Sequence, residues 1–230
     1  MHKLSVLMTA IALAAFTPLL LRADGTFSGN QLSQAYTPWY AQAASITGPV
    51  TDLAPGAGTL YNLQPGSSLY LVGNSTLHQY QMRAGTLLGS ARVAAGDLAA
   101  GLKAGSAGPM ALVVPLKDFK SRESGLDDNA DKALKADQNP QIRFDLKGEK
   151  FDGQTLTAQG TLSVAGVAAP VTLSAAAVLK DGTLRLKGVQ KLKMTDFKVT
   201  PPSISLLVTA ITCTDQVEIH YDVLFAAASK

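Results

Sequence analysis

The sequence predicts an all-β protein, an antiparallel barrel of about eight strands with one short helix between strands. From residue 59 onward, most segments alternate apolar and polar side chains with period two, which is typical of half-buried strands. The connections between these segments are short, and short connections favour antiparallel pairing. Only residues 126–137 have the spacing of a helix. A meander of this size can close into a barrel and so remove its exposed edges, although an all-β sandwich is the competing architecture.

The first 23 residues have the pattern of a secretory signal peptide. Lys3 gives a cationic start, and an apolar run follows over residues 4–21. Cleavage is expected after Ala23, which would leave a soluble mature protein, periplasmic or secreted, without a stable membrane span. The alternative is an uncleaved membrane anchor, because the apolar run approaches spanning length.

Residues 24–58 form a Gly/Ala/Pro-rich segment with only two charged residues and no regular periodicity. This pattern predicts a linker that precedes a barrel domain at residues 59–230. Three aromatic residues, Tyr36, Trp39 and Tyr40, are unusual in a linker. They either dock on the surface of the domain or act as a plug or binding element.

The expected strands follow one another along the domain. Residues 68–84 are expected to be long and extended, and the next strand follows across a turn at Ala84 and Gly85. Later segments place their apolar residues on one face, and residues 180–182 are typical of a tight hairpin turn. The expected strand segments are 68–84, 85–93, 110–119, 141–151, 154–166, 169–180, 183–199 and 216–226.

Residues 203–213 are largely apolar on both faces. They follow Pro201 and Pro202, which lack amide donors and must end or bulge a strand. The preferred interpretation is a buried strand that starts near the barrel mouth. The alternative is a segment that flanks an apolar portal.

The helical segment has the features of a connector between two strands. Acids in its first turn oppose the helix dipole, and acid–base pairs four residues apart support the helix. A narrow apolar stripe follows one face, and an Asn-Pro pair stops the helix. We therefore expect this helix to close one end of the barrel. The first-turn acids are Asp127 and Asp128, the pairs are Asp128–Lys132 and Asp131–Lys135, the stripe is Ala130, Ala133 and Leu134, and the stop is Asn139 with Pro140.

Composition argues against several functional classes. A formal net charge of +3, without a dense basic stripe, predicts no nucleic-acid partner. Cys213 is the single cysteine, so the chain has no internal disulfide and no multi-cysteine metal site. The mature chain keeps two histidines, His78 and His220, whereas a catalytic zinc site usually needs three protein ligands. We expect no metal and no cofactor.

Catalytic motifs are also weak. Ser121 and Ser124 lie near acids but lack an oriented base and a Gly-x-Ser-x-Gly elbow. The adjacent carboxylates of the helix do not face one another, so they cannot form a glycosidase pair. We expect no enzymatic activity, and an enzyme of unknown class that uses His78, Asp196 and His220 is the third hypothesis.

Several motifs, in their order and spacing, resemble the YceI-like family. They are the helix and strand over residues 124–144, the hairpin "GTLSVAGVAAPVTL", the segment "MTDFKVTPPS" and the early "STLH". The resemblance covers residues 59–227, and the helix has Leu126 where family members often have Met. It implies an extended lipocalin-like barrel that is exported to the periplasm. Some family members bind a long polyisoprenoid chain in the barrel, and others have no settled ligand.

The resemblance and the alternation of side chains together predict an apolar ligand cavity inside the barrel. Small inward residues should leave volume that side chains do not fill, unless large residues across the barrel fill it. The predicted lining residues are Phe144, Leu162, Val164, Leu173, Leu186, Met194, Phe197 and Leu206. The small residues on the same face are Ala158, Gly160, Ala175, Ala177 and Gly188.

The sequence therefore predicts an exported, non-enzymatic protein that binds or carries an elongated apolar lipid of isoprenoid or fatty-acyl type. The alternative is a structural or interaction module of the cell envelope without a ligand, with the aromatic linker segment as its docking element. The oligomeric state is left open, a dimer included.

Overall fold

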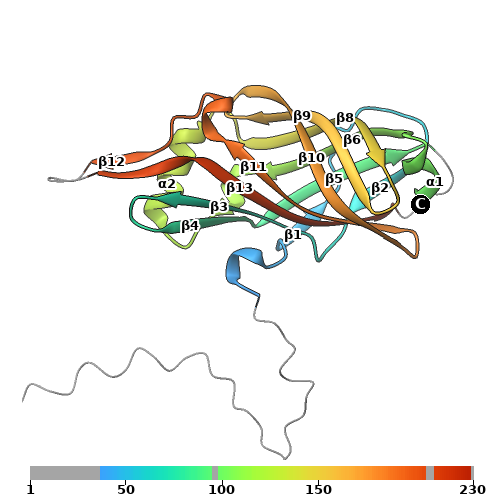
Figure 1. The fold of residues 1–230 in the computed structure, drawn as a ribbon, viewed down its shortest axis with the longest axis horizontal. Coiled ribbons are helices and arrows are strands. Elements are labelled where there is room, and N and C mark those ends of the chain that lie inside the picture. Colours follow the sequence, from blue (N-terminus) through green and yellow to red (C-terminus); the bar gives the residue numbers. More distant parts are fainter. Residues whose placement is uncertain (1–36, 95–97, 206–209, 229–230) are drawn as a thin grey trace, which may run out of the picture. The chain divides into compact units, whose positions relative to one another are not determined.

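The computed structural model describes residues 37–94, 98–205 and 210–228, and the elements below belong to the unit Pro38–Lys230. The predicted signal peptide and the first part of the predicted linker lie outside these residues. The strands are β1 (Ile46–Gly48), β2 (Thr59–Leu63), β3 (Ser68–Ser75), β4 (Gln79–Ala84), β5 (Thr86–Val93), β6 (Ala107–Pro115), β7 (Phe119–Lys120), β8 (Gln141–Phe151), β9 (Thr155–Val164), β10 (Val167–Lys180), β11 (Thr183–Lys193), β12 (Ser203–Ser205) and β13 (Ala210–Ala227). The helices are α1 (Leu98–Lys103), α2 (Ser124–Leu134) and the 3-10 turns η1 (Trp39–Ala41), η2 (Leu116–Asp118) and η3 (Met194–Phe197) (Figure 1).

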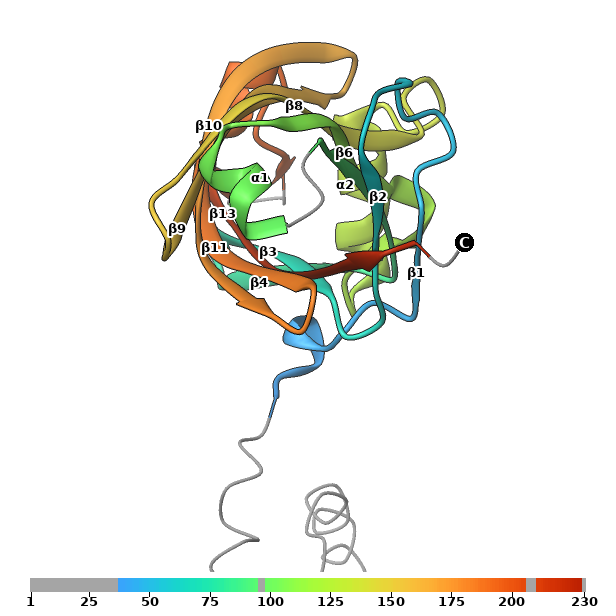
Figure 2. The same ribbon diagram turned by 90° about the vertical axis from the view of Figure 1, so that its right-hand side faces the viewer.

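Eight strands close into a barrel, as the sequence predicts. The order of neighbours is β5, β6, β8, β9, β10, β11 and β13, and β2 closes the ring because it pairs with both β13 and β5. Every pairing in this ring is antiparallel. Figure 2 shows the ring from the end at which α1 lies. Closure leaves these strands without a free edge, which protects them from pairing with another chain.

The sheet extends beyond this ring through β3, β4 and β7, which follow β13 in the order of neighbours. β13 pairs with β2 near its C-terminal end and with β3 along its earlier part. β4 pairs with β3 and β7, and it passes into β5 through Gly85. The Gly85 amide donates to the carbonyl of Asp118 at 2.7 Å, and a Cβ atom at Gly85 would lie 3.0 Å from that oxygen. This close approach favours glycine, and it makes residues 84–85 a bend within the sheet rather than the turn that the sequence predicts.

Residues 68–84, expected to be extended throughout, form the β3–β4 hairpin instead. The chain reverses at residues 76–78, where the hydroxyl of Ser75 accepts hydrogen bonds from the amides of Leu77 and His78. The same hydroxyl donates to the carbonyl of His78 at 2.9 Å. Such local bonds from serine stabilise turns. The turn contains neither glycine nor proline, so the sequence gives no strong sign of it.

α2 lies between β7 and β8, where the sequence predicts a helix at residues 126–137. It begins two residues earlier and ends at Leu134, because Lys135 adopts a left-handed conformation with φ of 53°. The helix therefore stops before the Asn-Pro pair that is expected to end it. Leu126, Ala130 and Leu134 pack against the main hydrophobic core, so the helix covers one end of the barrel interior, as expected.

The acids of α2 bind partners that the sequence does not predict. Asp131 forms an ion pair with Lys120 of β7 at 2.8 Å rather than with Lys135. Asp127 accepts a hydrogen bond from the amide of Ser121 at 2.7 Å, which holds the chain that enters the helix. α2 lies next to β7, so Asp131 can bind Lys120 of β7. An exposed ion pair along a helix stabilises it only weakly, so the expected pair with Lys135 does not prevent this contact.

The C-terminal half of the predicted linker is part of the fold. β1 pairs in parallel with β5, outside the ring (Figure 2). Val50 is buried, and its amide donates to the hydroxyl of Ser90 at 3.0 Å. Asp52 forms an ion pair with Arg143 of β8 at 2.8 Å. Residues 46–52 therefore fasten to the outside of the barrel, and a strand of three residues is too short to show periodicity in the sequence.

β12 and the beginning of β13 form a two-stranded ribbon. Among the described strands, β12 pairs with β13 alone. Ser203 and Ala210, on either side of the tip, are exposed. At the described ends of the segment 203–213 the prediction of a buried strand is therefore wrong, although Cys213 also pairs with Ser75 of β3. Residues 206–209, which include the predicted lining residue Leu206, lie outside the described part of the chain.

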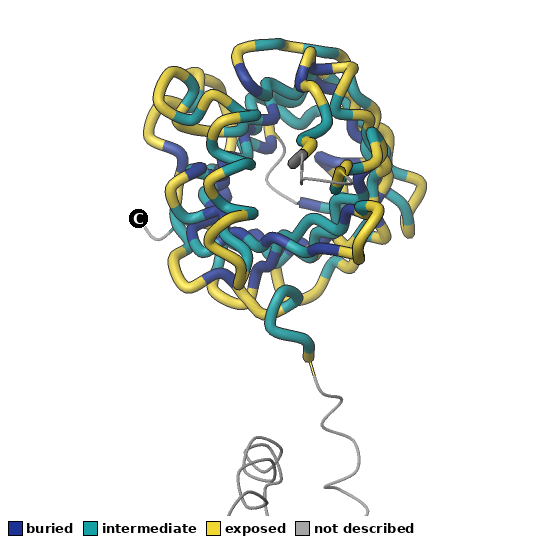
Figure 3. Tube along the Cα trace, turned by 90° about the vertical axis from the view of Figure 1, so that its left-hand side faces the viewer, coloured by how far each residue is buried: buried dark blue, intermediate teal, exposed yellow. Residues whose placement is uncertain are grey.

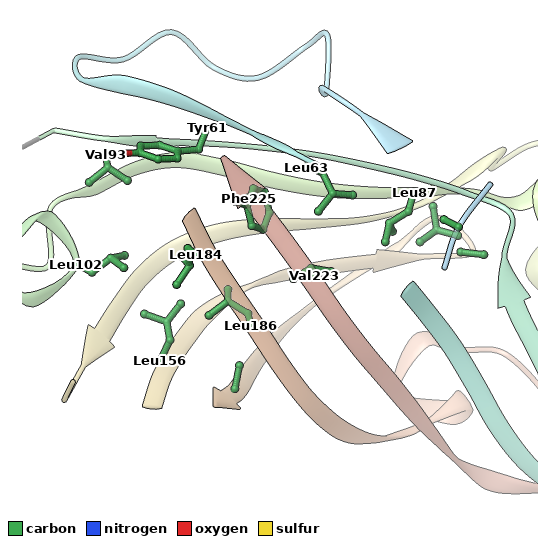
Figure 4. Close-up of a cluster of buried hydrophobic side chains, with 14 of the residues drawn as sticks. Tyr61, Leu63, Leu87, Val93, Leu102, Leu156, Leu184, Leu186, Val223 and Phe225 are labelled. Atoms are coloured by element: carbon green, nitrogen blue, oxygen red, sulfur yellow. The ribbon is translucent and has the colours of Figure 1, made fainter. Parts of the chain in front are cut away.

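The core follows the alternation that the sequence shows. More and less exposed residues alternate along much of the trace (Figure 3), and in β10 every second residue is exposed while those between are intermediate or, at Ala175, buried. The β10–β11 hairpin turns at Asp181 and Gly182, whose φ values of 49° and 73° fit the tight turn predicted there. The largest cluster of buried side chains includes Leu102 of α1, Leu184 and Phe225 at the α1 end of the barrel (Figure 4).

Candidate functional site

The barrel interior contains an apolar cavity with a volume of about 230 Å³. Its wall consists of side chains from β3, β4, β6, β7, β8, β9, β10, β11 and β13, together with residues of α2, of η3 and of the segment that follows η3. Alternation along each strand sends every second side chain to this wall. Nearly all of these side chains are apolar. The polar or weakly polar ones are Tyr80, Gln190, Lys193, Cys213 and Tyr221.

Seven of the eight predicted lining residues lie in the cavity wall. Those of the strands come from β8, β9, β10 and β11, and two more come from η3. They are Phe144, Leu162, Val164, Leu173, Leu186, Met194 and Phe197. Their contact with a ligand stays a prediction.

Two of the small residues do not leave the space that the sequence suggests. A Cβ atom on Gly160 would collide with the ring of Phe144, and one on Gly188 would collide with the ring of Tyr221. The expectation of free volume at these glycines is therefore wrong. The glycines make room for aromatic rings of neighbouring strands, and the rings occupy that room.

The alanines on the same face behave differently from the glycines. Ala158 and Ala175 lie in the cavity wall, whereas Ala177 packs against the main core. The small side chains of Ala158 and Ala175 therefore agree with the prediction that small inward residues border a cavity.

α2 contributes wall residues, whereas the sequence predicts it only as a connector that closes one end of the barrel. Leu126, Ala130, Ala133 and Leu134 all border the cavity. The apolar stripe of the helix was the available signal, since an apolar stripe needs an apolar surface to cover. The sequence could not show that this surface is the ligand cavity.

β13 supplies a second group that is absent from the predicted lining. Val217, Ile219, Tyr221 and Val223 follow one another at every second position and all border the cavity. The sequence places them on one face. Only the pairing of β13 with β11 and β3 shows that this face points inward.

The cavity reaches the surface at the end formed by η3 and the β12–β13 ribbon. Lys193 is exposed, and Met194 and Cys213 are partly exposed, although all three border the cavity. We call these three residues the mouth. At the opposite end the wall includes Leu156 and Leu186, which are buried. The cavity therefore extends along the barrel from the mouth to these two leucines.

Two tyrosine side chains in the wall keep their protons. The hydroxyl of Tyr221 donates to the carbonyl of Ser174 at 2.9 Å, and burial raises the pKa of Tyr221 to about 12. Burial also raises the pKa of Tyr80, and the neighbouring thiol of Cys213 adds to this shift. Both phenols are therefore neutral near pH 7. Lys193, at the mouth, is the one ionic side chain in the described wall.

The two candidate histidines have separate partners. Nδ1 of His78 lies 2.8 Å from the carbonyl oxygen of Gln79, and its Nε2 lies 3.7 Å from Glu123. His220 stacks on Tyr70 with ring centroids 4.6 Å apart, on the outer face that its parity predicts. Within the described part of the chain, no three His, Cys, Asp or Glu side chains are grouped as metal ligands would be.

The closed antiparallel ring and its apolar interior define a lipocalin-like barrel. The chain belongs to the YceI-like domain family, whose model matches residues 61–225. Comparison with curated proteins finds no match. No helix in the described part of the chain is long and apolar enough to cross a membrane.

Two solved structures share this fold. Burkholderia cenocepacia BcnA has a TM-score of 0.56 and 17% sequence identity, over 69% of this chain and 95% of that chain. A polyisoprenoid binding domain from Saccharophagus degradans has a TM-score of 0.54 and 12% identity, over 73% of this chain and 98% of that chain. At these identities the similarity shows the common barrel.

Proposed function

We propose that the protein is an exported, non-enzymatic binding or carrier protein that holds one elongated apolar lipid inside the barrel. Isoprenoid and fatty-acyl chains are the preferred class of ligand. The observation that carries the proposal is the apolar cavity within a closed barrel. Membership of the YceI-like domain family and structural similarity to a polyisoprenoid binding domain support the same class of ligand.

A cavity of this size is costly when nothing fills it. Cavities made by mutation in protein cores cost about 24 cal/mol per Å³, so the observed volume of about 230 Å³ corresponds to up to about 6 kcal/mol. The free energy of unfolding of a whole domain is only about 5–15 kcal/mol. A lipid chain recovers about 0.8 kcal/mol for each methylene that it buries. Binding of an apolar chain therefore stabilises the barrel.

The shape and chemistry of the wall favour a slender apolar chain. The volume exceeds the roughly 150 Å³ of an engineered cavity that binds benzene and lies below the about 300–1,000 Å³ of common ligand pockets. Few polar side chains border the cavity, and the Tyr221 hydroxyl already donates to Ser174, so a buried polar ligand would lose water and gain few hydrogen bonds. A polar end group would instead lie at the mouth, beside Lys193.

The placement of the candidate catalytic groups supports a non-enzymatic role. The hydroxyl of Ser121 binds the backbone of Glu123, which is the role of a turn residue. His78 and His220 have their own partners outside the cavity wall, so neither is placed as a base beside a nucleophile. A measured turnover that disappears when His78, Asp196 and His220 are all changed to alanine would contradict this part of the proposal.

The decisive experiment compares two neighbouring alanines of β10. Ala175 lies in the cavity wall, whereas Ala176 is exposed. Native mass spectrometry of the protein purified from its own host should show a bound lipid. Ala175→Phe should lower lipid retention roughly tenfold or more, because its ring replaces at least two methylenes of the ligand. Ala176→Phe should retain the wild-type amount, and a wild-type protein that is always empty would refute the proposal.

Export is the second part of the proposal and rests on the signal pattern of residues 1–23. Fractionation of cells that express the full chain should place it outside the cytoplasm. Sequencing of its N-terminus should give Asp24 as the first residue. Recovery of the uncut chain with the membranes would favour the anchored alternative.

An interaction module without a ligand is the second candidate, and it rests on the aromatic residues of η1. Tyr40 packs on Tyr70 with ring centroids 5.2 Å apart, and Arg122 lies 4.9 Å from the ring centroid of Trp39. Side chains of the barrel therefore already cover part of this surface. Deleting residues 24–58 would also remove the buried Val50, so Trp39→Ala with Tyr40→Ala is the cleaner variant. Lipid retention should survive these changes if the barrel is the carrier.

A further inference from the structure

A second, smaller apolar cavity lies inside the barrel toward α1. Its volume is about 30 Å³, and its wall includes residues of β2, β5, β6, β8, β9, β11 and β13. Leu98 and Leu102 of α1 also border it, and both are buried. Figure 2 shows α1 at the end of the ring. The interior is therefore divided into two compartments rather than forming one continuous tube.

Among the described residues, three side chains belong to the walls of both cavities, and we call them the partition. They are Met110 of β6, Leu156 of β9 and Leu186 of β11. In the ring, β8 separates β6 from β9, and β10 separates β9 from β11, so the three side chains approach the interior from different directions. Leu156 and Leu186 are only 6% and 5% exposed. Figure 4 shows both among the buried side chains, with Leu184 nearby.

We propose that the partition sets the length of the apolar chain that the barrel accepts. This inference rests on the proposed function, because it concerns the inner end of the same cavity. A chain that enters at the mouth can extend inward until its end meets the partition. Each further methylene must stay at the mouth, near water, and gains little from burial. The limit on the length of the bound chain is abrupt, because buried leucines in a packed core do not move aside without strain.

Met110 is the most adaptable side chain of the partition. Methionine is unbranched and adapts to irregular space, and Met110 is less buried than the two leucines. Removing its side chain together with that of Leu156 would join the second cavity to the main one. A larger side chain beside the partition would instead shorten the main cavity. Ala175 is suited to this purpose, because it borders the main cavity and pairs with Leu156 across the β9–β10 ladder.

A series of linear 1-alkanols, each two carbons longer than the last, tests the proposal by displacement of a fluorescent apolar probe from the purified protein. For the wild type, affinity should rise about fourfold per methylene, which corresponds to about 0.8 kcal/mol, up to a break length and then level off. Met110→Ala with Leu156→Ala should move the break to longer alkanols by at least one step. The slope for shorter alkanols should stay unchanged.

Two further variants keep the test informative. Leu184→Ala is the matched control, because Leu184 is buried and borders the second cavity but not the main one. Its break length should equal that of the wild type. Ala175→Leu should move the break to shorter alkanols, and it provides a test in the opposite direction if the double variant does not fold.

The outcomes separate this inference from the proposed function. A wild-type break that neither the double variant nor Ala175→Leu moves would overturn the partition and leave the carrier function standing. An equal shift with Leu184→Ala would also overturn it, because general loosening of the core would then explain the result. A wild-type protein that binds no alkanol of any length would overturn both.

Discussion

The ring of Tyr221 lies over Gly188, the residue directly opposite it in the ladder between β11 and β13. Its hydroxyl reaches beyond β11 and donates to the carbonyl of Ser174 in β10 at 2.9 Å. One side chain thereby connects three strands of the cavity wall, and it can do so only because residue 188 has no side chain. Gly73 and Tyr80 repeat the arrangement in the β3–β4 ladder. Aromatic rings over glycines of neighbouring strands therefore stiffen the wall.

Gly188→Ala should lower the free energy of unfolding by about 1–3 kcal/mol, because a Cβ atom there displaces the Tyr221 ring. Gly148→Ala is the matched control within a strand, since a Cβ atom at Gly148 would meet nothing within 4 Å. Its effect should stay within about 0.5 kcal/mol. Urea unfolding followed by circular dichroism measures both values, and equal effects at the two glycines would contradict the packing role of Gly188.

Tyr221 should also make stability depend on pH in the alkaline range. Burial raises its pKa from 10.0 to about 12, so the folded state favours the neutral phenol. This contribution is complete below pH 10 and is lost as the pH rises through about 12, because the unfolded chain ionises first. The free energy of unfolding of the wild type should therefore fall more steeply above pH 10 than that of Tyr221→Phe. Urea unfolding at several pH values, with phenolate absorbance as a second signal, checks this, and parallel profiles would refute it.

Long strands made much of the fold predictable. Over eleven residues of β8 and of β11, alternation repeats often enough to place Phe144 and Leu186 on the inner face. The turn at residues 76–78 was not predicted, because it carries no distinctive turn sequence, and the turn predicted at Ala84 and Gly85 is a bend within the sheet. β1 was not predicted either, since three residues hold no periodicity. Pairing with β5, which is a tertiary effect, makes that segment a strand.

Free volume was much harder to predict than the inner face. The sequence predicts free space at Gly160 and Gly188, yet the rings of Phe144 and Tyr221 fill it. Which ring covers which glycine depends on strand register, and the alternation within a single strand does not determine its register with a neighbouring strand. The contribution of α2 to the cavity wall was not predicted, for a similar reason. Its stripe is visible in the sequence, but the surface that it covers exists only in the folded barrel.

The thiol of Cys213 should report on occupancy of the cavity. It is the only thiol of the chain, it borders the cavity at the mouth, and it is partly exposed. A bound 1-alkanol should slow its reaction with N-ethylmaleimide roughly in proportion to the fraction of protein that is occupied. Mass spectrometry at timed intervals, with and without 1-dodecanol, measures the rate.

A second thiol position provides the control for this measurement. Gln216 is exposed on β13, so Cys213→Ser with Gln216→Cys moves the thiol to an exposed site on the same strand. Its labelling rate should not respond to 1-dodecanol. If the alkanol leaves labelling of Cys213 unchanged at concentrations that displace a fluorescent probe, the alkanol does not occupy the mouth of the cavity.

Replacing Arg143, which binds the N-terminal arm of residues 46–52, should lower the free energy of unfolding more than replacing its partner Asp52. The side chain of Arg143 is 18% exposed and binds both Asp52 and Asp145, whereas Asp52 is 68% exposed. Asp52→Asn should cost less than about 1 kcal/mol of unfolding free energy, as is usual for an exposed pair. Arg143→Ala also leaves Asp145 without its partner, so its cost should be larger, about 1–3 kcal/mol.

Acid should remove the contribution of Asp52. The hydrogen bond from Arg143 lowers the pKa of Asp52 below 3.8, so this contribution is present above that pH and is lost as the pH falls through the lowered value. The difference in stability between the wild type and Asp52→Asn should therefore be measurable by urea unfolding at pH 7 and should shrink toward zero in strong acid. A difference that persists there would mean that the amide disturbs the arm by another route. A cost for Asp52→Asn equal to that of Arg143→Ala would show that Asp52, not Asp145, is the partner on which Arg143 depends.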